Sequence, residues 1–240
     1  MKILSIGNSF SQDAQRYLHR LAKQDGTKMK TVNLYIGGCS LQKHYLNMLD
    51  DNVAYDFEFN GEGTGLKVSI RQALVSDDWD VITLQQASHL SGRYETYSPY
   101  IEALAAYVRK YCPHSKILLH QTWAYEEESK RLTELALFAT SKEMLSAVCD
   151  SYSKAAQSIK ADGIIPCGEA MMRAVELGIG KIHRDTFHAS LGVGRYLLAL
   201  CFYKFLTKKD ITGNAFDDFD VPVTEQEREI AIRAVNSVLA

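Results

Sequence analysis

The sequence predicts an α/β fold: a three-layer α/β/α sandwich around a mostly parallel sheet of five strands. Short β-branched runs alternate along the chain with longer segments of helical periodicity. The short runs are almost continuously apolar, as expected of strands that helices cover on both faces. Only four prolines and no low-complexity run interrupt the 240 residues, so we expect a single domain over residues 1–240.

Five short runs rich in apolar and β-branched residues are the predicted strands. They lie at residues 2–6, 30–36, 80–84, 116–120 and 163–166. Because helical segments separate these runs, we expect parallel pairing with right-handed crossovers.

Six longer segments have the periodicity of helices. They lie at residues 11–24, 99–111, 141–160, 168–177, 191–206 and 224–239. The last one opens with Thr224 and Glu227, which have the spacing of a capping box. The charged run at 126–131 is expected to be a solvated helix start, because acidic residues favour that end of a helix.

Residues 51–67 fit neither pattern. Three aromatic residues alternate there and are followed by three glycines. This arrangement predicts a short extended segment and a mobile loop near the edge of the sheet.

Composition narrows the class of protein. The formal net charge of -2 gives no overall attraction to nucleic acid or to an anionic membrane, so neither is an expected partner. No apolar stretch is long enough to span a bilayer, and the run at 3–6 is too short for a signal peptide. A cytoplasmic protein is therefore the simplest expectation, although a secreted protein whose signal had been removed would look the same.

The chain also lacks the patterns of cofactor-binding and disulfide-rich proteins. Its five cysteines form no CxxC pair, and no set of His, Asp and Glu has the spacing of metal ligands. No glycine-rich phosphate loop follows a predicted strand. We therefore expect no metal and no other cofactor. The sequence leaves the oligomeric state unknown.

Polar residues and glycines directly follow four of the predicted strands. They are Ser9, Gly37, Gly38, Gln85, Gln86 and Gln121. Because the carboxyl ends of parallel strands share one edge of the sheet, we expect these residues along one rim. Open α/β sheets bind their ligands at that rim, which makes it the predicted place of an active site.

The turn at residues 7–9 places a hydroxyl between the first strand and the first helix. If Ser11 caps that helix, Ser9 lies on the turn before it, where the helix N-terminus favours developing negative charge. A lone serine in such a turn is more often only a turn or cap residue. Near the other end of the chain, however, Asp185 and His188 supply an acid and a base three residues apart, the partners that a serine nucleophile needs.

Two segments resemble the end blocks of the SGNH/GDSL hydrolases. Residues 6–11 (IGNSFS) look like the first block, with Asn8 in place of the usual Asp and Phe10 in place of Leu. Residues 184–188 (RDTFH) resemble the last block, in which Asp and His are three apart before the final helix. The resemblance covers essentially the whole chain in block order and implies the flavodoxin-like SGNH hydrolase fold.

The resemblance also implies the roles of a catalytic triad. Ser9 would be the nucleophile, His188 the general base and then the general acid, and Asp185 the residue that orients the imidazole. The implied activity is a serine esterase that forms an acyl-enzyme from a small acyl ester, with acetyl on a carbohydrate as one candidate. The expected partner is thus a small-molecule or glycan ester.

The middle blocks give the predicted oxyanion hole. Besides the N–H of Ser9, Gly38 resembles the family glycine whose backbone N–H donates to the oxyanion. Residues 84–88 (LQQAS) stand where the family has Gly-x-Asn-Asp, and this Gln-Gln block resembles a bacterial branch of the superfamily. An amide of Gln can donate as an amide of Asn does. We favour Gln86 over Gln85 as the third donor.

Six residues near the predicted rim are candidates for binding the substrate. They are Gln85, Ser88, His89, Gln121, Trp123 and Tyr125. Ordinary core packing or a plain loop explains these residues equally well. Two other functions also stay open: a lipase or thioesterase of the same fold, and a catalytically silent carbohydrate-binding protein, because the third block is atypical.

Overall fold

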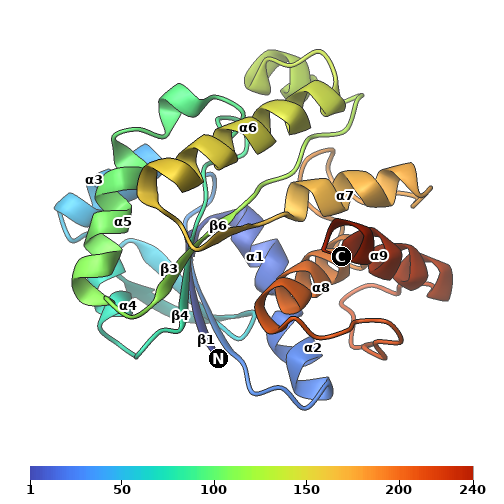
Figure 1. Ribbon diagram of the computed structural model, residues 1–240, viewed down its shortest axis with the longest axis horizontal. Coiled ribbons are helices and arrows are strands. Elements are labelled where there is room, and N and C mark those ends of the chain that lie inside the picture. The colour runs from blue at the N-terminus through green and yellow to red at the C-terminus, as the bar shows by residue number, and fades with distance from the viewer. Residues whose placement is uncertain (240) are drawn as a thin grey trace.

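The computed structural model describes residues 1–239 as layers of helices around a central sheet (Figure 1). Within those residues the sheet has seven strands, in the order β4-β3-β2-β1-β5-β6-β7. Five strands are parallel: β1 (Lys2–Gly7), β2 (Lys30–Tyr35), β5 (Val81–Leu84), β6 (Lys116–His120) and β7 (Gly163–Ile165). All five predicted strands are confirmed, and their order is that of flavodoxin-like sheets.

The sheet is larger than predicted because residues 51–67 contain a hairpin. β3 (Tyr55–Phe59) pairs antiparallel with β2 and with β4 (Glu62–Val68), so the sheet is mixed. Asn60 and Gly61 connect the two strands with φ of 52° and 83°, the left-handed values that a tight hairpin turn requires. The predicted extended segment is therefore confirmed as β3, whereas the predicted five-stranded sheet and the mobile loop are wrong.

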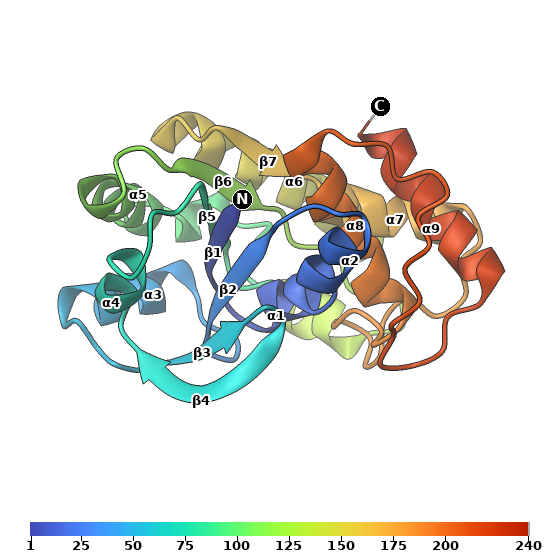
Figure 2. The same cartoon turned by 90° about the horizontal axis from the view of Figure 1, so that it is seen from below.

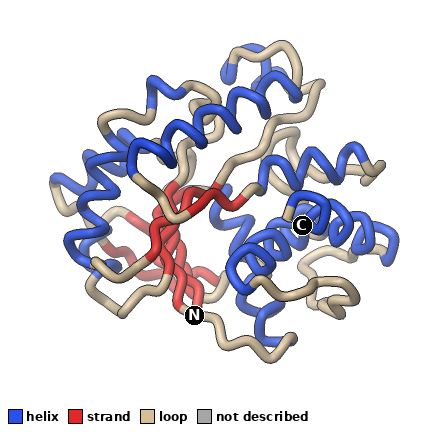
Figure 3. Tube along the Cα trace, in the orientation of Figure 1, coloured by secondary structure: helices blue, strands red, loops and turns tan. Residues whose placement is uncertain are grey.

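Helices cover both faces of the sheet, and the strands lie between them (Figures 2 and 3). One layer contains α1 (Ser9–Gln15), α2 (Leu18–Gln24), α7 (Cys167–Glu176), α8 (Val193–Thr207) and α9 (Glu225–Val238). The other layer contains α3 (Leu41–Leu49), α4 (Ile70–Leu74), α5 (Tyr100–Tyr111) and α6 (Ser141–Ile159). Short helical turns η1 (Tyr94–Thr96) and η2 (Leu132–Ala136) lie in the connections before α5 and α6.

Five of the six predicted helices are confirmed, with ends that differ by at most two residues. The capping box at Thr224 and Glu227 is present at the start of α9. The predicted helix at 11–24 is instead two helices, α1 and α2, which are separated at residues 16–17. The sequence patterns did not predict α3 or α4.

The core lies around the central strands. All four residues of β5 are buried, as are residues 3–7 of β1, and the helix α8 is buried along most of its length. The strand ends are therefore held in a tightly packed frame, which fixes the turns that follow them. In the part of the chain that the structure describes, no helix has both the length and the apolar character to cross a membrane.

Candidate active site

A cavity of about 390 Å³ opens at the carboxyl ends of β1, β2 and β5. Its walls come from the turns after these strands, from the connection between β6 and α6, and from the segment that precedes α8. β1 and β5 are the neighbouring strands from which the parallel sheet extends in opposite directions, which is where such sheets bind ligands. The cavity therefore lies at the rim that the sequence predicts.

Ser9, His188 and Asp185 form a continuous chain of hydrogen bonds at this cavity. The Oγ of Ser9 lies 2.8 Å from Nε2 of His188. The Nδ1 of His188 lies 2.8 Å from Oδ2 of Asp185, and the backbone N–H of His188 donates to Oδ1 at 2.9 Å. Ser9 and His188 are 179 positions apart, so the fold alone brings them together.

The Asp185 carboxylate determines which tautomer of the neutral imidazole is favoured. Burial raises the pKa of Asp185, but hydrogen bonds from the ring and backbone of His188 outweigh that effect and leave the pKa below its ordinary value. An ionised carboxylate only accepts, so in neutral His188 the proton resides on Nδ1. The lone pair of Nε2 then faces the hydroxyl of Ser9.

Asn8 fixes the turn that carries Ser9. Asn8, and not Ser11, is the N-cap of α1. Its Oδ1 accepts the N–H of Phe10 at 3.0 Å, and the Oγ of Ser11 accepts the N–H of Asn8. The Nδ2 of Asn8 donates to the carbonyl of Cys39 at 3.0 Å. An ionised Asp could not make that bond, which gives a physical reason for Asn at this position. Ser9 thus begins α1, at the positive end of the helix.

Gly38 lies at the same cavity after β2. Its φ of 62° is in the left-handed region, and a Cβ placed there would meet no atom within 4 Å. Glycine is therefore required by the backbone conformation and not by crowding. Within residues 1–239, the backbone N–H groups of Ser9 and Gly38 donate no hydrogen bond, and both residues line the cavity. They are available to an anionic oxygen bound there.

Gln86, the predicted third donor, does not face the cavity. Its side chain is fully buried, and Nε2 donates to the carbonyl and the hydroxyl oxygens of Thr96 at 3.0 and 3.1 Å. Its Oε1 accepts the backbone N–H groups of Leu41 and Ala87 at 2.9 and 2.8 Å. The Gln86 amide thus makes hydrogen bonds to three segments of the protein. The assignment of Gln86 to the oxyanion hole is therefore wrong.

Gln85 also points into the protein. Its Nε2 donates to Oδ1 of Asn8 at 2.7 Å, and its Oε1 lies 2.7 Å from Nδ1 of His120. All three residues are buried. Gln85 therefore connects the end of β6 to the turn that carries Ser9, and its predicted contact with substrate is not supported.

Three of the other candidate binding residues line the cavity: Ser88, His89 and Tyr125. The hydroxyls of Ser88 and Tyr125 lie 2.8 Å apart. Partial burial, together with the positive charges of Arg93 and Arg131, lowers the pKa of His89, so its imidazole is neutral near pH 7.

Gln121 and Trp123 do not line the cavity. The Oε1 of Gln121 accepts the N–H of Glu169 at 3.1 Å, away from Ser9. The fully buried Trp123 stacks on Phe10 with 4.0 Å between ring centroids, and its indole N–H donates to the carbonyl of Phe187 at 2.8 Å. Trp123 thus supports the cavity wall from behind, and both predicted contacts with substrate are wrong.

The sequence patterns did not predict several of the residues that line the Ser9 cavity. They are Gln12, Tyr35, Arg131, Leu135, Arg184 and Phe187. Two of these lie inside the 184–188 block, so the motif itself was a signal for them. Arg131 and Leu135 come from the connection between β6 and α6, and no local pattern indicates that it passes over the cavity.

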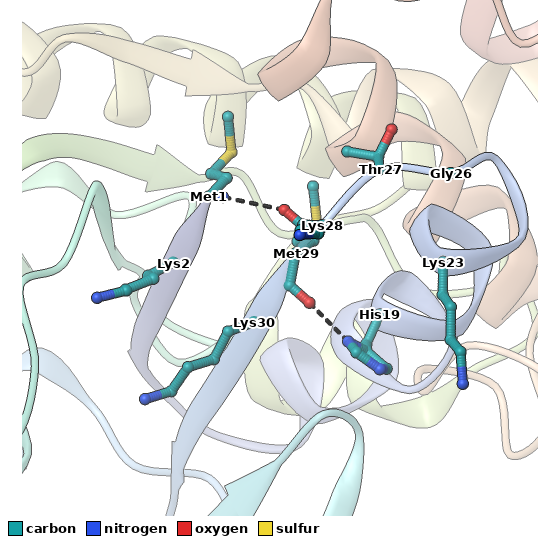
Figure 4. Close-up of a pocket in the computed structure, with 9 residues that line it drawn as sticks. All are labelled: Met1, Lys2, His19, Lys23, Gly26, Thr27, Lys28, Met29 and Lys30. Atoms are coloured by element: carbon teal, nitrogen blue, oxygen red, sulfur yellow. Dashed lines mark hydrogen bonds between the residues drawn. The ribbon is translucent and has the colours of Figure 1, made fainter.

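A different cavity, of about 480 Å³, lies at the start of β1 and β2, the end of the sheet remote from Ser9 (Figure 4). It is rich in lysines, but Lys2 and Lys30 both pair with Asp77, at 2.5 and 2.6 Å. Its histidine, His19, makes a hydrogen bond to the carbonyl of Met29 at 2.6 Å. Its lining contains no nucleophile paired with a base, so the cavity at Ser9 is the better candidate for an active site.

The fold is that of the SGNH/GDSL hydrolase superfamily, as the resemblance predicted. The structure is similar to that of a candidate SGNH hydrolase from Slackia heliotrinireducens, with 19% identity over 86% of this chain and 98% of that one, and a TM-score of 0.62. It is also similar to an acetyl-xylooligosaccharide esterase from Geobacillus, with 14% identity over 90% and 94% of the two chains and a TM-score of 0.51.

Within that fold class, the chain belongs to the DUF4886 family, described as a domain of unknown function, whose model matches residues 2–237. The crystal structure of a DUF4886 family protein from Bacteroides uniformis is similar over 100% of this chain and 95% of that one, with 34% identity and a TM-score of 0.91. The comparison with curated proteins found no match.

Proposed function

We propose that this chain is a serine hydrolase that cleaves a small acyl ester through a covalent acyl-enzyme. The observation that carries the proposal is the hydrogen-bonded chain from Ser9 through His188 to Asp185. The fold supports it, because structural neighbours are SGNH hydrolases, and one of them is an acetyl-xylooligosaccharide esterase. By analogy with that neighbour, acetyl on a carbohydrate is the candidate substrate.

In the first step, Nε2 of His188 takes the proton of the Ser9 hydroxyl as Oγ attacks the ester carbonyl. Asp185 stabilises the imidazolium that results. The N–H groups of Ser9 and Gly38 donate to the oxyanion of the tetrahedral intermediate. His188 then protonates the leaving alcohol, and a water molecule, deprotonated in turn by His188, releases the acyl group from Ser9.

The size of the cavity is consistent with a small acyl group. Its volume is about 390 Å³, and both apolar and polar residues line it. A long acyl chain would need a larger apolar surface to be buried in full. Rates of hydrolysis across esters of increasing acyl length distinguish the esterase from a lipase acting on long chains.

The proposal predicts labelling by a fluorophosphonate probe, which reacts only with an activated serine. We expect the wild-type protein to be labelled, Ser9→Ala to be unlabelled, and His188→Ala to be labelled at a rate lower by orders of magnitude. Labelling is measured by fluorescence after gel electrophoresis. A wild-type protein that is folded but not labelled would contradict the proposed hydrolase activity. It would favour the catalytically silent carbohydrate-binding protein instead.

With Gln85 and Gln86 directed inward, we infer that the third oxyanion donor is the neutral imidazole of His89. This residue also follows β5, and it lines the cavity with Ser9 and Gly38. We expect His89→Ala to lower kcat about a hundredfold, the loss typical of one oxyanion donor. His89→Asn retains an N–H donor and should recover part of the rate.

Steady-state ester hydrolysis measures this effect, with His114→Ala at an exposed position as the matched control. A kcat for His89→Ala within about threefold of the wild type would remove His89 from the oxyanion hole, since a lost donor costs far more than that.

A further inference from the structure

The charged side chains that line the Ser9 cavity are cationic. Among the described residues that line it, Arg131 and Arg184 are the arginines, and no Asp or Glu is present. Arg184 has an ion-pair partner, since its Nη1 lies 2.9 Å from both carboxylate oxygens of the fully buried Asp13. Arg131, in contrast, forms no ion pair within residues 1–239. One positive charge at this cavity therefore has no ion-pair partner among the described residues.

That charge is held next to the reacting groups. The guanidinium carbon of Arg131 lies 4.3 Å from the centroid of the Phe187 ring, which orients it by a cation–π interaction. The Phe187 ring in turn lies 3.9 Å from that of His188, centroid to centroid. Arg131 is thus placed one aromatic ring away from the base.

The segment that carries Arg131 is also tied to the segment that carries the triad. The hydroxyls of Ser129 and Thr186 lie 2.8 Å apart, and the N–H of Glu126 donates to the carbonyl of Thr186 at 2.9 Å. Thr186 lies between Asp185 and His188 in the chain. These hydrogen bonds hold the segment that carries Arg131 against the segment that carries Asp185 and His188.

The acidic side chains of this region lie in a neighbouring cavity. Tyr125 is shared between the Ser9 cavity and one of about 480 Å³, which four glutamates and Lys142 line. The glutamates are Glu126, Glu127, Glu128 and Glu176. The charged residues that line the two adjacent cavities therefore differ in sign. Of the two, the cavity that contains Ser9 favours an anion.

We propose that the substrate is an ester that carries an anionic group, a carboxylate or a phosphate, and that Arg131 binds this group. The guanidinium is suited to either anion, because its planar N–H donors match their oxygens in pairs. Arg131 is then the residue that determines specificity, while Ser9 and His188 carry the reaction. The inference rests on the proposed esterase and adds the class of its substrate.

Activated aryl esters test the charge preference without knowledge of the natural substrate. With the anion on the alcohol side, the acetyl esters of para-hydroxybenzoate and para-hydroxyphenyl phosphate are compared with that of neutral para-hydroxybenzamide. With the anion on the acyl side, the para-nitrophenyl ester of adipic acid is compared with that of neutral adipamic acid. We expect kcat/KM to be about tenfold higher for the anionic member of at least one set, the effect of one charge-assisted hydrogen bond.

Two variants test whether Arg131 causes the preference for anionic esters. In Arg131→Gln the ratio of kcat/KM for the anionic ester to that for the neutral ester should fall to about one. In the wild type, raising the salt concentration should weaken the preference, because ions screen an exposed charge. Arg173→Gln, an exposed arginine paired with Glu176 away from the cavity, should keep the ratio. The better of the two anions on the alcohol side distinguishes carboxylate from phosphate.

The absence of any preference in the wild type, or a preference that survives in Arg131→Gln, would overturn the inference and leave the esterase intact. If Ser9 is labelled by a fluorophosphonate but the protein hydrolyses none of the esters, protection of Ser9 from labelling gives the same comparison. The carboxylate or phosphate compound should then slow the labelling more than the neutral carboxamide does. A wild-type protein that is neither labelled nor active would instead contradict the proposed function.

Discussion

Replacement of Asp185 by Asn is expected to lower kcat by about three to four orders of magnitude, the loss known for this change in a serine–histidine–aspartate triad. An Asn amide can donate to Nδ1 of His188, whereas the carboxylate of Asp185 accepts a hydrogen bond from Nδ1, with 2.8 Å between Nδ1 and Oδ2. The imidazole would then carry its proton on Nε2, facing Ser9, and could not take the proton of the hydroxyl. Shape and packing hardly change, so the fold should be retained.

Steady-state hydrolysis of an aryl acetate measures this effect, and circular dichroism checks the fold. Asp150→Asn, at an exposed position on α6, is the matched control and should keep the wild-type kcat. A kcat for Asp185→Asn within about tenfold of the wild type would show that Asp185 does not set the tautomer, since that role is worth far more.

Replacement of Asp13 by Ala is expected to lower the free energy of unfolding by about 3 to 5 kcal/mol, the cost of removing one partner from a buried ion pair. Asp13 is fully buried and lies 2.9 Å from nitrogens of both Arg184 and Arg195. Without it, Arg184 loses its ion-pair partner and Arg195 keeps only Asp220. Arg184 precedes Asp185 in the chain, so the position of Asp185 should also be less well defined.

Urea denaturation gives the free energy of unfolding for this comparison. The control is Asp218→Ala. The side chain of Asp218 is 65% exposed, and its removal breaks an ion pair with Arg20. Exposed ion pairs contribute about 1 kcal/mol or less, so this variant should be nearly as stable as the wild type. Equal losses in the two variants would show that burial of Asp13 has no special weight.

The five parallel strands of the sheet were predictable because each is a short apolar run between helical segments. The hairpin β3–β4 was missed although Asn60-Gly61, the pair of residues most typical of a tight hairpin turn, lies between its strands. β4 is exposed along most of its length, so it lacks the apolar pattern by which a buried strand is recognised.

The hydrogen-bonded set of Ser9, His188 and Asp185 was predictable from two short motifs and their order in the chain. The proposed third oxyanion donor, His89, was not, because directly after a strand each step of one residue changes the direction of the side chain. Gln85 and Gln86 both point inward, and the first lining residue after β5 is Ser88. Local sequence does not record which residue of such a turn reaches the cavity.

The position of Arg131 at the cavity was also not predictable from local patterns. The run at 126–131 is rich in charge, and a solvated helix start was the simplest interpretation of it. In the structure a short helical segment does begin at residue 130 and continues into η2, so that expectation is confirmed. The same segment also lies at the cavity, held by the contacts of Glu126 and Ser129 with Thr186. Contacts between segments so distant in sequence appear only when the fold is known.

The most direct measurement of the central claim is the site of the fluorophosphonate adduct. Trypsin should release residues 3–16 as one peptide, which contains Ser9 together with the fully buried Ser5 and Ser11. Fragmentation of this peptide in the mass spectrometer assigns the adduct to one of the three serines. An adduct on Ser9 that is lost in His188→Ala is the predicted result; an adduct on any other residue would contradict Ser9 as the nucleophile.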